Sequence, residues 1–272
     1  MTAAATTGVV ADRRPSWRSV ALPTEHGGWG LTAEPVLLGL LVAGSWSGLA
    51  LGLCAVSAFL VRTPLKLVLV DRRRGRRLQR TVMAQRLAAV QLLAIAVLAV
   101  LALVAAGPGW LLPVAVAVPL IAIEMWFDVR SRSRRLVPEL CGAVGIASVA
   151  ASIVVAGGGE LRLALAVWVV LAGRAVASIP YVRAQIQRLR HGAASTTAAD
   201  AWQCGGVALA VAATLLDGDV VLGAVAVALL AGLQATSMRR SPVPPAKTIG
   251  IRQTVFGLSV VAATAINVLA AA

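Results

Sequence analysis

The fold is decided by residues 87–123, which read LAAVQLLAIAVLAVLALVAAGPGWLLPVAVAVPLIAI and contain no Asp, Glu, Lys or Arg. A helix needs about 20 apolar residues to cross a hydrocarbon core of about 30 Å. The stretch is long enough for two such helices, and Gly107-Pro108-Gly109 divides it at a turn. It therefore predicts an all-α, polytopic transmembrane bundle.

The composition of the whole chain agrees with this interpretation and excludes a soluble domain. Hydrophobic residues make up 59% of the 272 positions, charged residues only 13%, and the mean hydropathy is +0.85. The net charge of +14 comes from basic residues between apolar runs, without interleaved aromatics or a nucleic-acid motif. Anionic lipid headgroups, and not nucleic acid, are the expected partners of these residues.

Nine apolar segments are expected to span the membrane. Asp217-Gly218-Asp219 separates the seventh from the eighth, and the count drops to eight if those two form one helix. The expected segments are 27–45, 48–70, 84–106, 109–128, 137–157, 161–182, 200–216, 219–237 and 252–271. They form one domain, residues 23–272, preceded by a tail, residues 1–22, that is expected to be disordered and lacks the apolar core of a signal peptide.

The connections between these segments alternate in charge. Those after the second, fourth, sixth and eighth segments are rich in arginine, whereas the others are short and Gly-rich, with Arg162 as their single basic residue. Because basic residues stay on the cytoplasmic side, the N-terminus is predicted to be cytoplasmic and the C-terminus external. The predicted location is the bacterial cytoplasmic membrane.

A cluster of unusual residues, Pro23-Thr24-Glu25-His26-Gly27-Gly28-Trp29-Gly30, opens the first segment. Its glycines would allow a ligand or backbone to approach closely, and Trp29 suits the membrane interface. Glu25 and His26 form a candidate acid/base pair at the cytoplasmic end of the bundle.

Two cations, Arg62 and Lys66, lie four residues apart on one face of the second segment. A charge at membrane depth costs at least about 2.5 kcal/mol on insertion scales, and like charges at this spacing repel. An anionic partner or ligand is therefore expected beside them, together with Asp71, although both side chains could instead reach the cytoplasmic interface.

The sixth segment carries a polar stripe on one helical face, at spacings of three or four residues: Arg174, Ser178, Tyr181, Gln185 and Arg188. Arg174 lies about 13 Å before Arg183 along the helix, close to the middle of the membrane. A wet, inward-facing groove is the favoured interpretation, with Arg174, Ser178 and Tyr181 as ligand-binding residues.

Carboxylates within the apolar segments are the expected counter-ions. Glu34 is the natural partner of Arg62 or Arg174. Glu124 and Asp128, four residues apart, could bind Mg²⁺, although ion pairs with the arginines at 130–135 are favoured over metal binding. The three cysteines are isolated from one another and indicate neither a zinc site nor a disulfide.

The opening cluster resembles the Pro-x-Glu-His-Gly-Ala-Trp signature of the YwiC-like family of bacterial multi-span membrane proteins, with Gly28 in place of the usual Ala. Arg62-Thr63-Pro64-Leu65 and Ile249-Gly250-Ile251 are also similar to family features. The resemblance extends from Pro23 to the C-terminus and implies no particular reaction.

The architecture also resembles the UbiA-type intramembrane prenyltransferases, which have nine spans and cytoplasmic polar clusters after the second and sixth. That resemblance implies Mg²⁺-bound isoprenyl diphosphate held by paired aspartate motifs. In this chain the region around the end of the second span contains Arg62, Lys66 and a single aspartate, Asp71. The region around the end of the sixth span contains Tyr181, Arg183 and the distant Asp200. An anion held directly by cations therefore fits this chain better than the usual Mg²⁺ chemistry.

Three functions follow from these observations. The first is a non-standard UbiA-like enzyme or binder of an anionic lipid or isoprenoid-type ligand, with a cytoplasm-facing cavity lined by His26, Arg62, Lys66, Arg174 and Tyr181. The second is a non-catalytic assembly partner. The third is a transporter of a small anion or metabolite that uses Arg174 and Glu34, although an odd number of spans without a repeat argues against paired inverted repeats.

Overall fold

The computed structural model describes residues 20–21, 26–76, 78–132 and 134–272, and the side chain of His26 is outside this description. Glu25 and nearly all of the predicted tail lie outside the described residues. Within the described residues the secondary structure is helical, and no strand occurs. The helices that the described residues show with defined bounds are α2 (His26–Val42), α3 (Trp46–Arg73), α4 (Gln79–Ala106), α5 (Leu111–Val129), α6 (Leu136–Ala156), α7 (Leu161–His191), α8 (Thr196–Leu216), the 3-10 turn η1 (Gly218–Val220), α9 (Val221–Met238) and α10 (Ala246–Ala271).

These helices are those of a multi-pass membrane protein. Eight of them, α3 to α10, are long and apolar enough to cross a membrane, while α2 is a shorter apolar helix of 17 residues. At about 1.5 Å per residue, α2 is about 25 Å long and falls slightly short of a typical hydrocarbon core. The all-α prediction is confirmed, and α8 and α9 are separate helices joined by η1.

Several helices extend beyond the predicted spans. Helix α7 continues to His191, past the predicted end at residue 182, and stops at Gly192, whose φ of +78° favours glycine. Helix α10 begins at Ala246, directly after Pro245, and not at residue 252. The predicted bounds are those of the membrane-embedded segments, because hydropathy does not mark the polar ends of a helix.

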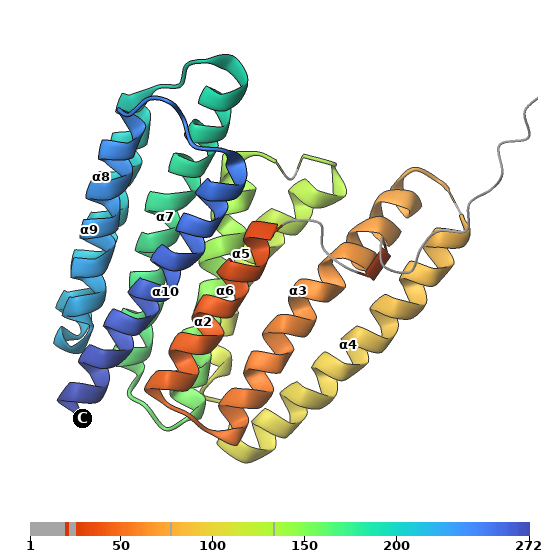
Figure 1. Ribbon diagram of the computed structural model, residues 1–272. Coiled ribbons are helices and arrows are strands. Elements are labelled where there is room, and N and C mark those ends of the chain that lie inside the picture. The colour runs from red at the N-terminus through yellow and green to blue at the C-terminus, as the bar shows by residue number, and fades with distance from the viewer. Residues whose placement is uncertain (1–19, 22–25, 77, 133) are drawn as a thin grey trace, which may run out of the picture.

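The helices lie side by side in an extended array, with α4 at one edge and α8 and α9 at the other (Figure 1). Helix α7 lies in the interior, packed against α6, α8, α9 and α10, and is the most buried of the eight long helices. Helix α4 packs on α3 and is the least buried, so most of its apolar surface is available to lipid. Polar side chains on α7 are therefore surrounded by protein.

Close packing of small residues holds α7 against α8. A Cβ atom on Gly206 would lie 2.6 Å from the carbonyl oxygen of Gly173, and one on Gly173 would meet the carbonyl oxygen of Gly206 at the same distance. Paired small residues of this kind allow two membrane helices to approach at backbone distance. The contact fixes α7 immediately beside Arg174.

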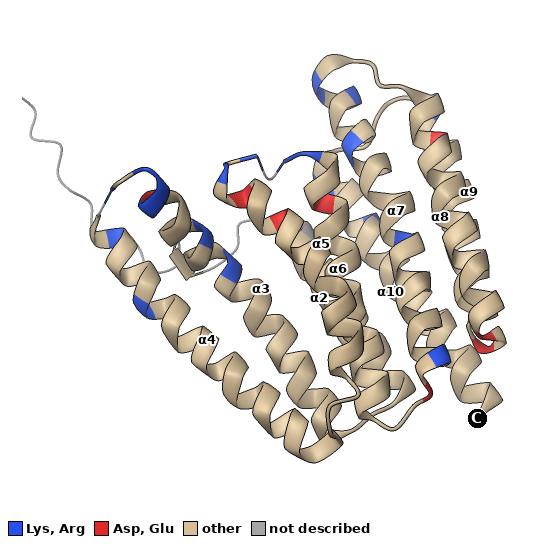
Figure 2. Ribbon diagram, turned by 180° about the vertical axis from the view of Figure 1, so that it is seen from behind, with Lys and Arg blue, Asp and Glu red and all other residues tan. Residues whose placement is uncertain are grey.

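The charged residues are distributed unevenly between the two ends of the bundle. Lys and Arg gather at the end where α3 joins α4, α5 joins α6 and α7 joins α8 (Figure 2). At the opposite end, Arg162 donates to the carbonyl oxygen of Leu216 at 2.9 Å, where it satisfies the C-terminus of α8. This distribution is the one expected if the basic end is cytoplasmic.

Candidate functional site

A buried ion pair joins α2 to α7. Nη2 of Arg174 donates to Oε1 of Glu34 at 2.7 Å and to the carbonyl oxygen of Gln253 on α10 at 2.9 Å. The two side chains are only 5% and 4% exposed. Of the two partners predicted for Glu34, the structure selects Arg174.

The pair lies deep within the bundle, far from the helix ends. Glu34 is about 12 Å from the start of α2, and Arg174 is about 20 Å from the start of α7, at about 1.5 Å per residue. Neither side chain reaches the membrane surface, because both are buried against neighbouring helices. The two charges compensate each other within the protein.

Gly257 on α10 provides the space that the ion pair occupies. A Cβ atom at this position would overlap the carboxylate of Glu34 and the guanidinium of Arg174. A larger residue could not be accommodated without moving α10 or the pair. The sequence did not single out Gly257, because its role depends on side chains from two other helices.

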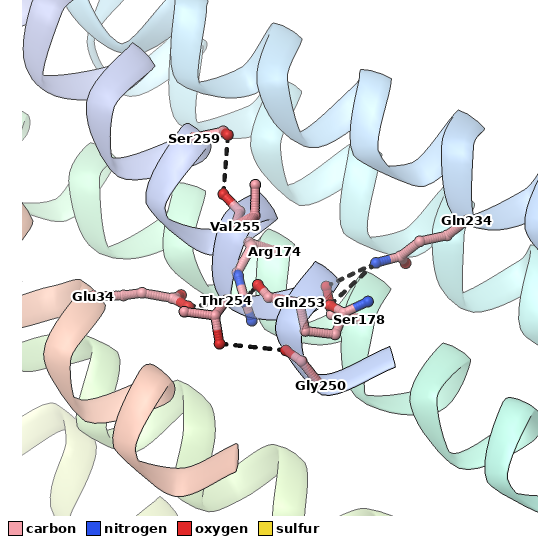
Figure 3. A network of polar contacts seen from close by, with 9 residues as sticks. All are labelled: Glu34, Arg174, Ser178, Gln234, Gly250, Gln253, Thr254, Val255 and Ser259. Atoms are coloured by element: carbon pink, nitrogen blue, oxygen red, sulfur yellow. Dashed lines mark hydrogen bonds and ion pairs between the residues drawn. The ribbon is translucent and has the colours of Figure 1, made fainter. Parts of the chain in front are cut away.

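Uncharged polar side chains extend the pair into a network across α7, α9 and α10 (Figure 3), which Gln203 extends to α8. Gln234 accepts from Nε2 of Gln203 at 2.8 Å and donates to Oγ of Ser178 at 3.2 Å and to Oε1 of Gln253 at 3.4 Å. Gln203, Gln234 and Gln253 were not predicted, although a glutamine within an apolar span is itself a signal. We call Glu34, Arg174, Ser178, Gln203, Gln234 and Gln253 the central polar network.

Three polar atoms of the central polar network are buried without a hydrogen-bond partner among the described residues. They are Nε of Arg174, Oε1 of Gln203 and Nε2 of Gln253. Buried polar atoms are nearly always hydrogen-bonded, so each exception calls for an explanation. These two donors and one acceptor belong to three members of the central polar network and are available to a small polar ligand.

The rest of the predicted α7 stripe continues toward the basic end and packs against α9. The hydroxyl of Tyr181 bonds to Oγ of Ser237 at 3.0 Å and accepts from Nε2 of Gln185 at 3.2 Å. Arg188 donates to the carbonyl oxygen of Arg240 at 3.0 Å. The members of the stripe from Arg174 to Gln185 are buried against α9 and α10, so the structure lends no support to a wet groove on this face, and the groove stays a prediction.

A second cluster of charges joins α3 to α5 near the basic end. Nε of Arg62 and Nζ of Lys66 contact the two carboxylate oxygens of Asp128 at 2.8 and 3.2 Å, and Nη2 of Arg62 contacts Glu124 at 2.8 Å. Asp128 is fully buried, while Arg62 and Lys66 are about a quarter to a third exposed. The predicted anionic partner of the two cations is confirmed. We call these four residues the α3–α5 ionic cluster.

Glu124 and Asp128 form ion pairs with a different helix from the one predicted. Ion pairs with the arginines at 130–135 were expected, and the structure instead pairs Glu124 with Arg62, and Asp128 with Arg62 and Lys66, all on α3. Within the described residues, no three His, Cys, Asp or Glu side chains are gathered as in a metal site. A role for Mg²⁺ stays a prediction that the structure does not test.

Asp71 holds the α3–α4 turn together. Its carboxylate accepts from Oγ1 of Thr81 at 2.6 Å and from Nη2 of Arg80 at 3.3 Å, and it is buried. These partners lie on the first turn of α4, so Asp71 belongs to the hairpin. Its predicted role in ligand binding stays a prediction.

Gly28 and Trp29, from the described end of the opening cluster, pack against α3. The rings of Trp29 and Phe59 meet edge to face with their centroids 5.1 Å apart, and a Cβ atom on Gly28 would overlap the Phe59 ring. Phe59 lies one helical turn before Arg62, so this packing brings the start of α2 close to the α3–α5 ionic cluster. The side chains of Glu25 and His26 lie outside the described part of the chain.

The predicted ligand-binding residues thus contact different helices. Arg62 and Lys66 bond to α5, whereas Arg174 bonds to α2 and α10, and Tyr181 bonds to α9. The expectation that one cavity is lined by all of these residues is not what the contacts show. Arg174 with Glu34 is the group most completely enclosed by protein.

A comparison with known protein families finds a match for about the first half of the chain. Residues 22–154 match the family model described as YwiC-like protein. The resemblance to the YwiC-like family is confirmed. The match includes Glu34 and the whole α3–α5 ionic cluster, whereas Arg174 and the Ile249–Ile251 features lie beyond it. No curated protein and no solved structure matches the chain, so the UbiA-like architecture stays a prediction.

Proposed function

We propose that this YwiC-like membrane protein is a carrier for a small anion, with Arg174 as its binding group. The observation that supports the proposal is the Glu34–Arg174 ion pair at 2.7 Å, enclosed by protein in the interior of a membrane-spanning bundle. Ionisable residues at this depth are costly, and they usually mark a substrate or ion pathway.

The chemistry of Arg174 favours an oxyanion or carboxylate as the ligand. A guanidinium stays charged in proteins and offers a planar set of donors that matches carboxylate and phosphate oxygens. Glu34 already shows that Arg174 can hold a carboxylate in this environment. A ligand anion would take the place of Glu34 on the guanidinium.

The surrounding residues favour a ligand of few atoms. Gln203 and Gln234, like Glu34 and Arg174, are buried on all sides. The unpartnered donors on Arg174 and Gln253 would bind ligand oxygens, and Oε1 of Gln203 would accept from a ligand hydroxyl. An odd number of predicted spans argues against a carrier built from paired inverted repeats and leaves other carrier architectures open.

Anion binding to the purified, detergent-solubilised protein tests the proposal. Chloride, acetate, lactate and sulfate are added separately, and the shift in unfolding temperature is measured for the wild type and Arg174→Gln. We expect at least one anion to stabilise the wild type in a saturable way and to lose this effect in the variant. Arg239→Gln, which breaks an exposed pair with Asp200, should keep the wild-type response.

Flux measurements extend the test to transport. The anion that binds should enter proteoliposomes containing the wild type faster than those containing Arg174→Gln. If no anion stabilises the wild type, or if Arg174→Gln responds like the wild type, the proposed function is wrong.

A second candidate function rests on the α3–α5 ionic cluster. Arg62 and Lys66 converge on the buried Asp128 beside the start of α2, inside the region that matches the YwiC-like model. A lipid or isoprenoid phosphate would compete with Asp128 for these cations, with His26 and Glu25 as acid/base groups. The arginine-rich connections at this end would face anionic headgroups of a bacterial cytoplasmic membrane.

Lipid and quinone extracts of a deletion strain test this second candidate. A lipid or quinone whose amount changes in the deletion strain should return to its wild-type amount when the wild-type gene is reintroduced. It should not do so when an Arg62→Gln gene is introduced instead. An unchanged lipid and quinone profile would contradict it.

A further inference from the structure

The ligand of Arg174 would have to compete with a group that the protein itself supplies. Nη2 of Arg174 is bonded to Oε1 of Glu34 at 2.7 Å, and Gly257 leaves no room between the pair and α10. An anion that approaches Arg174 therefore meets the carboxylate of Glu34 at close range. Binding requires Glu34 to give up its contact or its charge.

The charge balance decides between these two possibilities. The resting pair is formally neutral, with one cation and one anion. Adding a monovalent anion while Glu34 remains ionised would place two negative charges beside one guanidinium, and net charge is disfavoured where solvent is excluded. If Glu34 takes up one proton as the anion binds, the site remains neutral.

Glu34 is the group placed to take up this proton. Arg174, its neighbour on α7, cannot lose a proton in proteins. On the other helices packed against α2, the charged and titratable groups are engaged elsewhere or exposed. On α6, Glu139 pairs with Arg183, and Cys141 is half-buried. On α3, Arg62 and Lys66 pair with Asp128, and the thiol of Cys54 bonds to the carbonyl oxygen of Ile95. On α10, Lys247 and Arg252 are exposed.

We infer that the carrier binds its anion together with one proton, which protonates Glu34 while the anion replaces its carboxylate on Arg174. This inference rests on the proposed function and names its coupled ion. The step conserves charge: one proton from solution forms an O–H bond on Glu34, and one monovalent anion forms the ion pair with Arg174. Release on the other side reverses both events.

Calorimetry with acetate and chloride tests the inference on the full-length protein. These anions do not titrate between about pH 6 and pH 8, so any proton taken up on binding belongs to the protein. Titrations in two buffers with different ionisation enthalpies give the number of protons. We expect about one proton per anion bound, and an affinity that falls about tenfold for each unit rise in pH.

Glu34→Gln removes the titrating group and keeps its shape. We expect this variant to bind the same anion without proton uptake, more tightly than the wild type at high pH and with no dependence on pH. Glu139→Gln, which changes the partly exposed pair with Arg183, should keep the wild-type proton uptake. If Glu34→Gln does not fold, the number of protons taken up by the wild type still shows whether anion binding is coupled to proton binding.

The two proposals fail in different ways. An anion that binds the wild type without proton uptake would overturn this inference and leave the proposed function intact. Proton uptake that persists in Glu34→Gln would also overturn it, because another group would then be the acceptor. No binding of any anion to the wild type would contradict the proposed function, and this inference with it.

Discussion

Arg174 and Glu34 each depend on the other for their place inside the bundle. A buried ion pair adds little stability compared with a pair of apolar residues, because removing two charges from water is costly. Removing one partner is much worse, because the remaining charge is left buried without compensation. This asymmetry separates a buried pair from an exposed one.

Variants of the pair make this asymmetry measurable. Arg174→Gln should destabilise the protein by about 3–5 kcal/mol, whereas Glu34→Gln combined with Arg174→Gln should be less destabilising than Arg174→Gln alone. Thermal or denaturant unfolding in detergent measures both. Arg239→Gln, in an exposed pair with Asp200, should change stability by only about 0–1 kcal/mol. A double variant as unstable as the sum of the single variants would contradict this account.

Individual residues differed in how far the sequence revealed their role. Arg174 and Glu34 stand out because charges are rare in apolar segments, and their pairing was one of two predicted for Glu34. The choice between Arg62 and Arg174 depends on which helices are neighbours, and hydropathy does not contain that information. Gln203 and Gln253 carry no charge and were therefore missed.

At the scale of helices, α10 can approach α2 and α7 only because Gly257 has no side chain. Gly250, about two turns earlier on α10, has open space around it. Two glycines on one helix therefore have different functions: one creates room for an ion pair, and the other has no packing role.

Alanine at these two positions should have opposite effects. Gly257→Ala should destabilise the protein by about 1–3 kcal/mol, because the added methyl group overlaps Glu34 and Arg174. Gly250→Ala should be neutral, or stabilising by up to about 1 kcal/mol through helix propensity. Unfolding temperatures of the two variants provide the comparison. Equal effects would mean that Gly257 does not limit the approach of α10.

The number and order of the helices were predictable from the sequence, but their lengths and neighbours were not. Apolar runs separated by arginine-rich or Gly-rich connections predict nine membrane spans. Among the described residues, eight helices are long and apolar enough to cross a membrane, and α2 is a ninth, shorter apolar helix. Helix α7 extends nine residues past the end of its predicted membrane span, because the stretch containing Gln185 and Arg188 is polar and yet helical, as the spacing of the stripe had predicted. Hydropathy also could not show that Asp128 on α5 would meet Arg62 on α3.

At the scale of the whole molecule, nine helices and one basic end determine the predicted orientation. An odd number of crossings places the two termini on opposite sides of the membrane. The basic end contains the start of α2 and the connections after α3, α5, α7 and α9 (Figure 2). The N-terminus is predicted to be cytoplasmic and the C-terminus external.

Reporter fusions test this orientation in cells. Alkaline phosphatase, which is active only outside the cytoplasm, should be active when fused after Ala272 and inactive when fused after Arg132 in the α5–α6 connection. Green fluorescent protein at the same two positions should give the opposite pattern. Activity of both phosphatase fusions, or of neither, would contradict nine crossings.

The separation of Glu34 and Arg174 along the chain also has a consequence for how the protein is made. The two residues are 140 positions apart. At a synthesis rate of about 5–20 residues per second, Arg174 leaves the ribosome about 7 to 28 s after Glu34. During that interval α2, already short for a membrane span, carries a carboxylate without its partner. The first helix therefore reaches its final place only when α7 and α10 have been delivered, so the earliest part of the chain to be translated is among the last to assemble.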